Sequence, residues 1–202
     1  MVHGDAMRTA VASMAAEPRF RLAIVMDLVT IAGVVGLIAG LHVVLRPVDR
    51  YWALTALALR LVENCVWAAA VLGLFAFLVL LDGSAYLASL PTAQMQALAY
   101  AALRVHDASY AVGFTFLGLG STVFAGLWLK SRYIPRAIAA WGVFSSLVMA
   151  IASTAVIVFP AVNGVLGMTY MFPLAIFEIG IGTWLLAYRL RDPSADRMAR
   201  TL

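Results

Sequence analysis

Residues 51–81 read YWALTALALRLVENCVWAAAVLGLFAFLVLL, an apolar run long enough to cross the hydrocarbon core of a bilayer as a helix. Arg60, Glu63 and Asn64 stand near its middle. The whole chain has the same character, because 64% of its 202 residues are hydrophobic and only 12% are charged. Lipid offers the backbone no hydrogen bonds, so continuous apolar runs indicate membrane-spanning helices. The sequence therefore predicts an all-α fold, a polytopic transmembrane helical bundle.

The apolar runs predict five spans in a single bundle over residues 21–190, between a flexible tail of residues 1–20 and a tail of residues 191–202. After the second span, Pro91 and Thr92 are favourable residues for starting a helix. Apolar residues recur at helical spacing after them, which predicts a short amphipathic helix on the membrane surface. The five predicted spans are residues 21–45, 51–78, 107–129, 135–159 and 166–189.

Basic residues bracket the spans, nine on one side and four on the other. The positive-inside rule places the nine in the cytoplasm, so we expect a bacterial inner-membrane protein with its N-terminus outside and its C-terminus cytoplasmic. No basic cluster or stripe suggests a nucleic-acid partner. The nine are Arg46, Arg50, Lys130, Arg132, Arg136, Arg189, Arg191, Arg197 and Arg200, and the four are Arg8, Arg19, Arg21 and Arg104.

Charged residues within the spans predict a polar centre. A charge at the middle of a membrane helix costs about 2.5–3.5 kcal/mol, so Arg60 and Glu63 should face the interior of the bundle. The rise per residue places Glu178, in the fifth span, at a similar depth. We therefore expect a buried polar cluster of Arg60, Glu63, Asn64 and Glu178, with Asp27 as an outer member.

The chemistry of this cluster is open from the sequence. A structural ion pair is one interpretation; two carboxylates that share a guanidinium could also hold a proton or a small ligand. Pro173, five residues before Glu178, predicts a kink that would free a backbone carbonyl. His106 with Glu63 and Glu178 are candidate metal or proton ligands, and a bound metal could activate water for hydrolysis. No catalytic motif supports an enzyme, and the sequence identifies no cofactor.

A stripe of small residues, Gly33, Gly36 and Gly40, is typical of close helix packing in membranes. The stripe could face another membrane protein or a second copy of the chain. Three functions therefore remain open. The first is a membrane protein whose polar cluster is structural or binds a proton or a small ligand. The second is a membrane-embedded metal-dependent hydrolase, and the third is an accessory subunit of a larger complex.

Three stretches, LRPVDRYWALTALALRLVE, KSRYIPRAIAAWG and MFPLAIFEIGIGTWLL, together resemble an uncharacterised bacterial membrane family catalogued as domain of unknown function 4386. The resemblance implies six spans, the first of which precedes Arg21, where this chain has only a short tail; we therefore expect that this span is missing or that the start given is too late. The resemblance implies no activity. It assigns the motif positions to Arg46, Pro47, Arg60, Glu63, His106, Ser131, Tyr133, Pro135, Arg136, Pro173, Glu178 and Trp184.

Overall fold

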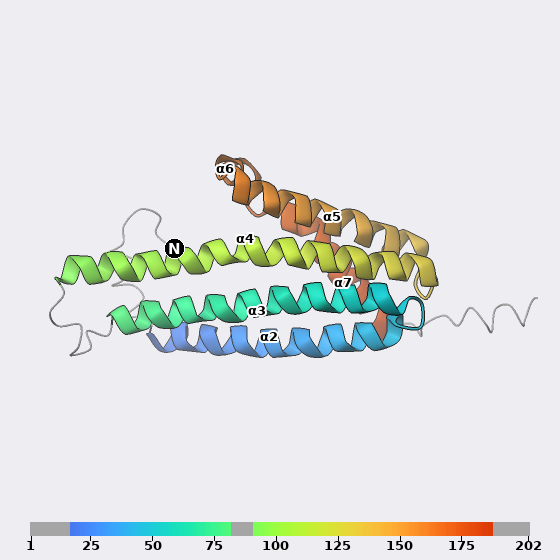
Figure 1. The fold of residues 1–202 in the computed structure, drawn as a ribbon, viewed down its shortest axis with the longest axis horizontal. Coiled ribbons are helices and arrows are strands. Elements are labelled where there is room, and N and C mark those ends of the chain that lie inside the picture. Colours follow the sequence, from blue (N-terminus) through green and yellow to red (C-terminus); the bar gives the residue numbers. More distant parts are fainter. Residues whose placement is uncertain (1–16, 82–90, 188–202) are drawn as a thin grey trace, which may run out of the picture. The chain divides into compact units, whose positions relative to one another are not determined.

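The computed structural model describes residues 17–81 and 91–187, and all regular structure within them is helical, which confirms the predicted fold class (Figure 1). Six α-helices and one short 3-10 helix occur in these residues. In chain order they are α2 (Glu17–Leu45), α3 (Arg50–Leu81), α4 (Thr92–Ser131), α5 (Arg136–Val158), α6 (Ala161–Leu166), η2 (Thr169–Met171) and α7 (Phe172–Ala187).

Five helical segments in the described residues are long and apolar enough to cross a membrane, as predicted. The protein is therefore an integral, multi-pass membrane protein. The predicted tails fall mostly in residues 1–16 and 188–202, outside the described residues. Residues 17–20, predicted as part of the N-terminal tail, instead form the first turn of α2.

The helix α4 differs from the prediction of a separate surface helix. It runs without interruption for 40 residues, so the expected surface segment is simply its first part. No glycine or proline occurs between Thr92 and Val112, and nothing in that stretch breaks the helix. A helix of this length measures about 60 Å, twice the hydrocarbon core, so α4 extends beyond the bilayer.

The proline predicted to kink the last span lies in the first turn of α7. The first N–H groups of a helix have no partner within it, so Pro173 removes no internal hydrogen bond and causes no kink there. The carbonyl of Thr169, which we expected to be free, accepts a hydrogen bond from the N–H of Phe172. The helix thus begins at Phe172, directly before the proline, instead of bending at Pro173.

The described chain forms two units, and the long helices α2, α3 and α4 each contribute to both. The first unit contains the residues up to Val35 together with Asn64–Tyr110. Its core is apolar and draws on all three helices, and the rings of Phe20 and Phe77 lie 5.4 Å apart. The buried residues of this core are Ile24, Val71, Leu74, Phe77, Leu78, Ala99 and Leu103.

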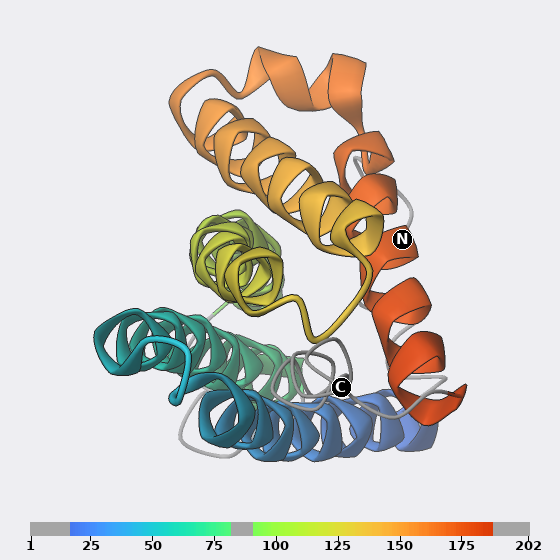
Figure 2. The ribbon, with the colours of Figure 1, turned by 90° about the vertical axis from the view of Figure 1, so that its right-hand side faces the viewer.

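The second unit contains Gly36–Glu63 and the chain from Ala111 onward. A short turn joins the end of α2 to α3, and Asp49 caps α3 by accepting a hydrogen bond of 3.3 Å from the N–H of Trp52. In the same unit α5 and α7 pack side by side and are joined through α6 (Figure 2). The indole N–H of Trp141 on α5 donates to the carbonyl of Pro173 on α7 at 3.1 Å.

Two glycines allow the helices of the second unit to approach closely. A Cβ added to Gly118 on α4 would lie 2.5 Å from the backbone nitrogen of Ala150 on α5. A Cβ added to Gly142 on α5 would lie 2.5 Å from the ring of Phe177 on α7. The contact at Gly118 is with backbone, so the close approach of α4 and α5 depends on glycine, whereas at Gly142 the ring of Phe177 would have to move to admit a side chain.

Candidate functional site

The polar centre of the second unit is an ion pair on α3. Arg60 and Glu63 are three residues apart, which places both side chains on one face of the helix. Arg60 Nη1 lies 2.9 Å from Glu63 Oε2, and the side chains are 7% and 0% exposed. Both charges are therefore withdrawn from lipid and water alike, and each depends on the other for compensation.

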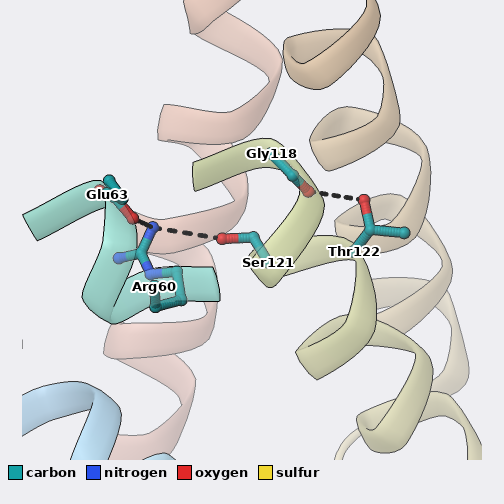
Figure 3. Close-up of polar contacts among 5 residues, drawn as sticks. All are labelled: Arg60, Glu63, Gly118, Ser121 and Thr122. Atoms are coloured by element: carbon teal, nitrogen blue, oxygen red, sulfur yellow. Dashed lines mark hydrogen bonds and ion pairs between the residues drawn. The ribbon is translucent and has the colours of Figure 1, made fainter. Parts of the chain in front are cut away.

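The helix α4 completes the surroundings of this pair (Figure 3). Arg60 Nη1 also donates a long hydrogen bond of 3.4 Å to the hydroxyl of Ser121. The stem of Arg60 runs over Gly120, where an added Cβ would lie 2.7 Å from the Arg60 Cγ. A glycine at this position is what allows a buried arginine to fit between α3 and α4.

The carboxylate of Glu63 is only partly compensated. Its Oε2 meets Arg60, although not in the geometry of a directed hydrogen bond, and its buried Oε1 has no donor among the described residues. A buried carboxylate oxygen without a donor is costly. Asn64, next along α3, is also buried, and neither atom of its amide group has a partner in the described part of the chain.

Glu178 on α7 differs from the expectation of a buried residue. Its side chain is exposed among the described residues. It nevertheless lies within electrostatic range of both Arg60 and Glu63. The two carboxylates and the guanidinium therefore influence one another electrostatically, although in the described residues only Arg60 and Glu63 form an ion pair at this site.

A second polar seam joins α4 and α5 and was not identified from the sequence. Thr115 on α4 donates to Ser153 on α5 at 3.1 Å. Ser145 and Ser146 on α5 are fully buried, and the hydroxyl of Ser146 has no partner in the described residues. The signal was present, since serines at helical spacing within an apolar span favour contacts between helices.

His106 belongs to the first unit, in the middle of α4, where it is packed and hydrogen-bonded. Its Nδ1 lies 2.9 Å from the carbonyl oxygen of Ala70 on α3, and because a carbonyl only accepts, Nδ1 carries the hydrogen. A Cβ on Gly73 would lie 3.3 Å from the Cβ of His106, so this glycine makes room for the histidine. The ring of Tyr110 meets that of His106 edge-on at 5.2 Å.

The remaining predicted site residues lie on α2. Asp27 is partly buried in the first unit, within electrostatic range of Tyr110. Gly33, Gly36 and Gly40 are exposed, and a Cβ on any of them would meet no atom of the described chain within 4 Å. These glycines do not mediate contacts between the described helices, and packing against a partner protein stays a prediction.

The residues proposed from the sequence as metal ligands do not form a metal site in the described chain. No group of three or more His, Cys, Asp or Glu residues with a suitable arrangement occurs in residues 17–81 and 91–187. The hydrolase function proposed for His106 and the carboxylates therefore gains no geometric support from the described residues.

Comparison with known proteins identifies a family and nothing more specific. Residues 1–188 match the family model described as Domain of unknown function (DUF4386). No curated protein and no solved structure matches the chain.

Proposed function

This chain belongs to the family of domain of unknown function 4386, and we propose that it binds and exchanges a proton within the membrane, at the Glu63 carboxyl beside Arg60. The observation that carries the proposal is the incomplete compensation of Glu63. Its side chain is fully buried, and one of its two oxygens has no donor among the described residues. A proton is the smallest species that removes the charge of such a group.

The balance of charge supports the same proposal. Arg60 contributes one positive charge, while Glu63 and Glu178 within its electrostatic range contribute two negative charges when both are ionised. The trio then carries a net negative charge in a medium of low dielectric constant, where such an excess is expensive. Uptake of one proton makes the trio neutral. Release of that proton restores the net negative charge. Because the positive charge of Arg60 stabilises the ionised form of Glu63, it also favours release of the proton.

A purely structural ion pair is the competing interpretation. Such a pair is most stable when hydrogen bonds satisfy its remaining lone pairs. Here Arg60 reaches Ser121 only at 3.4 Å, and Glu63 Oε1 is left without a donor in the described residues. The arrangement is therefore closer to that of a site that gains and loses a proton than to that of a structural network in which every polar atom has a hydrogen-bond partner.

Infrared difference spectroscopy tests the proposal on protein in lipid nanodiscs. We expect the wild type to show the carbonyl band of a protonated carboxyl group. This band should disappear reversibly as the pH is raised, and it should be absent from the Glu63→Gln variant. The Asp27→Asn variant is the matched control, since it removes a partly buried carboxylate of the first unit that does not belong to the trio, and it should retain the band. The Glu178→Gln variant leaves Arg60 and Glu63 as a neutral pair, so its band should disappear at a lower pH than that of the wild type. If the wild type shows no such band that depends on Glu63 at any pH at which it stays folded, the proposal is wrong.

We further propose that the turns at residues 46–49 and 132–135 face the cytoplasm of a bacterial cell. Lys130 Nζ lies 3.1 Å from Asp49 Oδ2, so the two basic turns meet at one end of the second unit. Positive charge gathered at one end is the usual signal for the cytoplasmic side. In a Cys65→Ser background, the Arg136→Cys variant should react with an impermeant maleimide only after cell lysis. Reaction in intact cells would reverse the orientation.

A further inference from the structure

An open cavity lies beside the turn between α2 and α3, outside the polar centre. It has a volume of about 640 Å³, and the described residues that line it belong to the second unit. This size lies within the range of about 300–1,000 Å³ that is usual for small-ligand sites. The lining residues are His42, Arg46, Pro47, Arg50 and Leu54.

The lining carries uncompensated positive charge. Arg46 and Arg50 are exposed, and no ion pair to either occurs in the described residues. The acid of this turn, Asp49, is engaged elsewhere, by Lys130 at 3.1 Å and by the N–H of Trp52 at 3.3 Å. The hydrogen bond from Lys130, together with that from Trp52, holds the pKa of Asp49 below its ordinary value. The negative charge of Asp49 is therefore compensated by Lys130. The two arginines are therefore available to an anion.

His42 adds a hydrogen-bond donor to the lining. Its Nδ1 is buried and has no partner among the described residues. A hydrogen on Nδ1 would be a buried donor without an acceptor, so the tautomer with its hydrogen on Nε2 is the less costly one. The Nε2–H group can then donate to a ligand oxygen.

The position of the cavity indicates the source of the anion. It lies where two spans meet their turn, and the next two residues, Tyr51 and Trp52, are 83% and 57% exposed. Exposed aromatic residues at the end of a span mark the level of the lipid headgroups. Leu54 adds an apolar side chain to the lining. A ligand with a phosphate group and an attached acyl chain matches this combination.

We propose that this cavity binds the phosphodiester headgroup of an anionic phospholipid, held by Arg46 and Arg50. Paired arginines suit phosphate because their N–H groups match its oxygens in a bidentate geometry. Basic pockets between membrane helices on the cytoplasmic side are a known form of headgroup site. The site is separate from the proton site at Glu63, and neither proposal depends on the other.

Native mass spectrometry of the full chain in mild detergent tests the site with phosphatidylglycerol and phosphatidylcholine as probes. We expect phosphatidylglycerol to be retained in preference to phosphatidylcholine, and the Arg46→Gln/Arg50→Gln variant to bind it about 30-fold more weakly. The Arg136→Gln variant is the matched control, because it removes an exposed arginine at the next turn of the same unit, and it should bind like the wild type.

Three results would overturn the proposal. The wild type could bind both lipids equally, or the double variant could retain phosphatidylglycerol like the wild type. Inorganic phosphate at millimolar concentration could displace the lipid, in which case the site takes free phosphate. Melting curves in detergent alone check that the variants fold, which is expected because both arginines are exposed. A double variant that fails to fold is replaced by the two single variants, each of which should bind phosphatidylglycerol more weakly than Arg136→Gln.

Discussion

Replacing Arg60 by methionine should destabilise the protein strongly. Methionine retains most of the stem volume over Gly120 but removes the guanidinium that lies 2.9 Å from Glu63 Oε2. Glu63 is fully buried, and no other donor in the described residues reaches its oxygens. Removing one partner of a buried ion pair costs about 3–5 kcal/mol, because the remaining charge is left uncompensated. We expect the free energy of unfolding of the Arg60→Met variant to fall by that amount at alkaline pH, where the carboxyl of Glu63 is ionised.

The second substitution shows whether the loss belongs to the pair. In the Arg60→Met/Glu63→Gln variant neither charge remains, so most of the stability should return. The lone Arg60→Met penalty should also shrink in acid, where the unpaired carboxyl takes up a proton and loses its charge.

Equilibrium unfolding in mixed micelles, monitored by circular dichroism, measures the single and the double variant against the wild type. The Thr183→Ala variant is a control, since this exposed threonine on α7 only returns a hydrogen bond to its own helix. The reasoning is refuted if Arg60→Met unfolds within about 1 kcal/mol of the wild type, or if the double variant is no more stable than the single one.

Two further predictions concern the helix contacts and the turn between α2 and α3. Gly118→Ala should lower the free energy of unfolding in micelles by about 1–3 kcal/mol, because the added Cβ would lie 2.5 Å from the backbone of Ala150. Gly126→Ala on the same helix is the control. Its Cβ would meet no atom of the described chain within 4 Å, so this substitution should be neutral or stabilising. Equal effects of the two substitutions would contradict the close approach of α4 and α5. Asp49→Asn keeps the helix cap but loses the pair with Lys130. Because the pKa of Asp49 is lowered in the fold, its stabilisation is present above its ordinary value of 3.8 and is lost as the pH falls through the folded value. The melting temperatures of wild type and variant should therefore differ at pH 7 and converge in acid; a difference that persists in acid would show that the charge of Asp49 is not the cause.

The sequence predicted the features that depend on composition and local spacing. Continuous apolar runs identified the five spans, and the cost of charge in lipid identified Arg60 and Glu63 as facing inward. The spacing of three residues placed them on one helix face, where the structure has them 2.9 Å apart. These conclusions required no knowledge of how the helices are arranged.

The remaining features depend on contacts that local patterns do not encode. Depth along a span put Glu178 level with Glu63 but could not say which side of α7 faces outward. Gly118 and Gly142 resemble the glycines of α2 in the sequence, yet only the former two meet a neighbouring helix in the described chain. Pro173 suggested a kink because the predicted span began at residue 166, which put the proline inside the helix. In the structure a short 3-10 helix precedes Phe172, and α7 begins at that residue. Errors of a few residues at helix ends thus changed the role assigned to a proline.

The most direct test of the proton site is the carboxyl signal of Glu63 itself, measured by solid-state NMR in lipid bilayers. The chain has only three glutamates, Glu17, Glu63 and Glu178, so labelling glutamate with ¹³C at Cδ gives few signals, and the Glu63→Gln variant assigns the one that matters. We predict that this signal moves reversibly between the positions of a neutral and an ionised carboxyl group as the pH changes. A Glu63 signal that stays at the ionised position over the whole range in which the protein is folded would contradict proton binding and leave the pair with Arg60 as a structural contact.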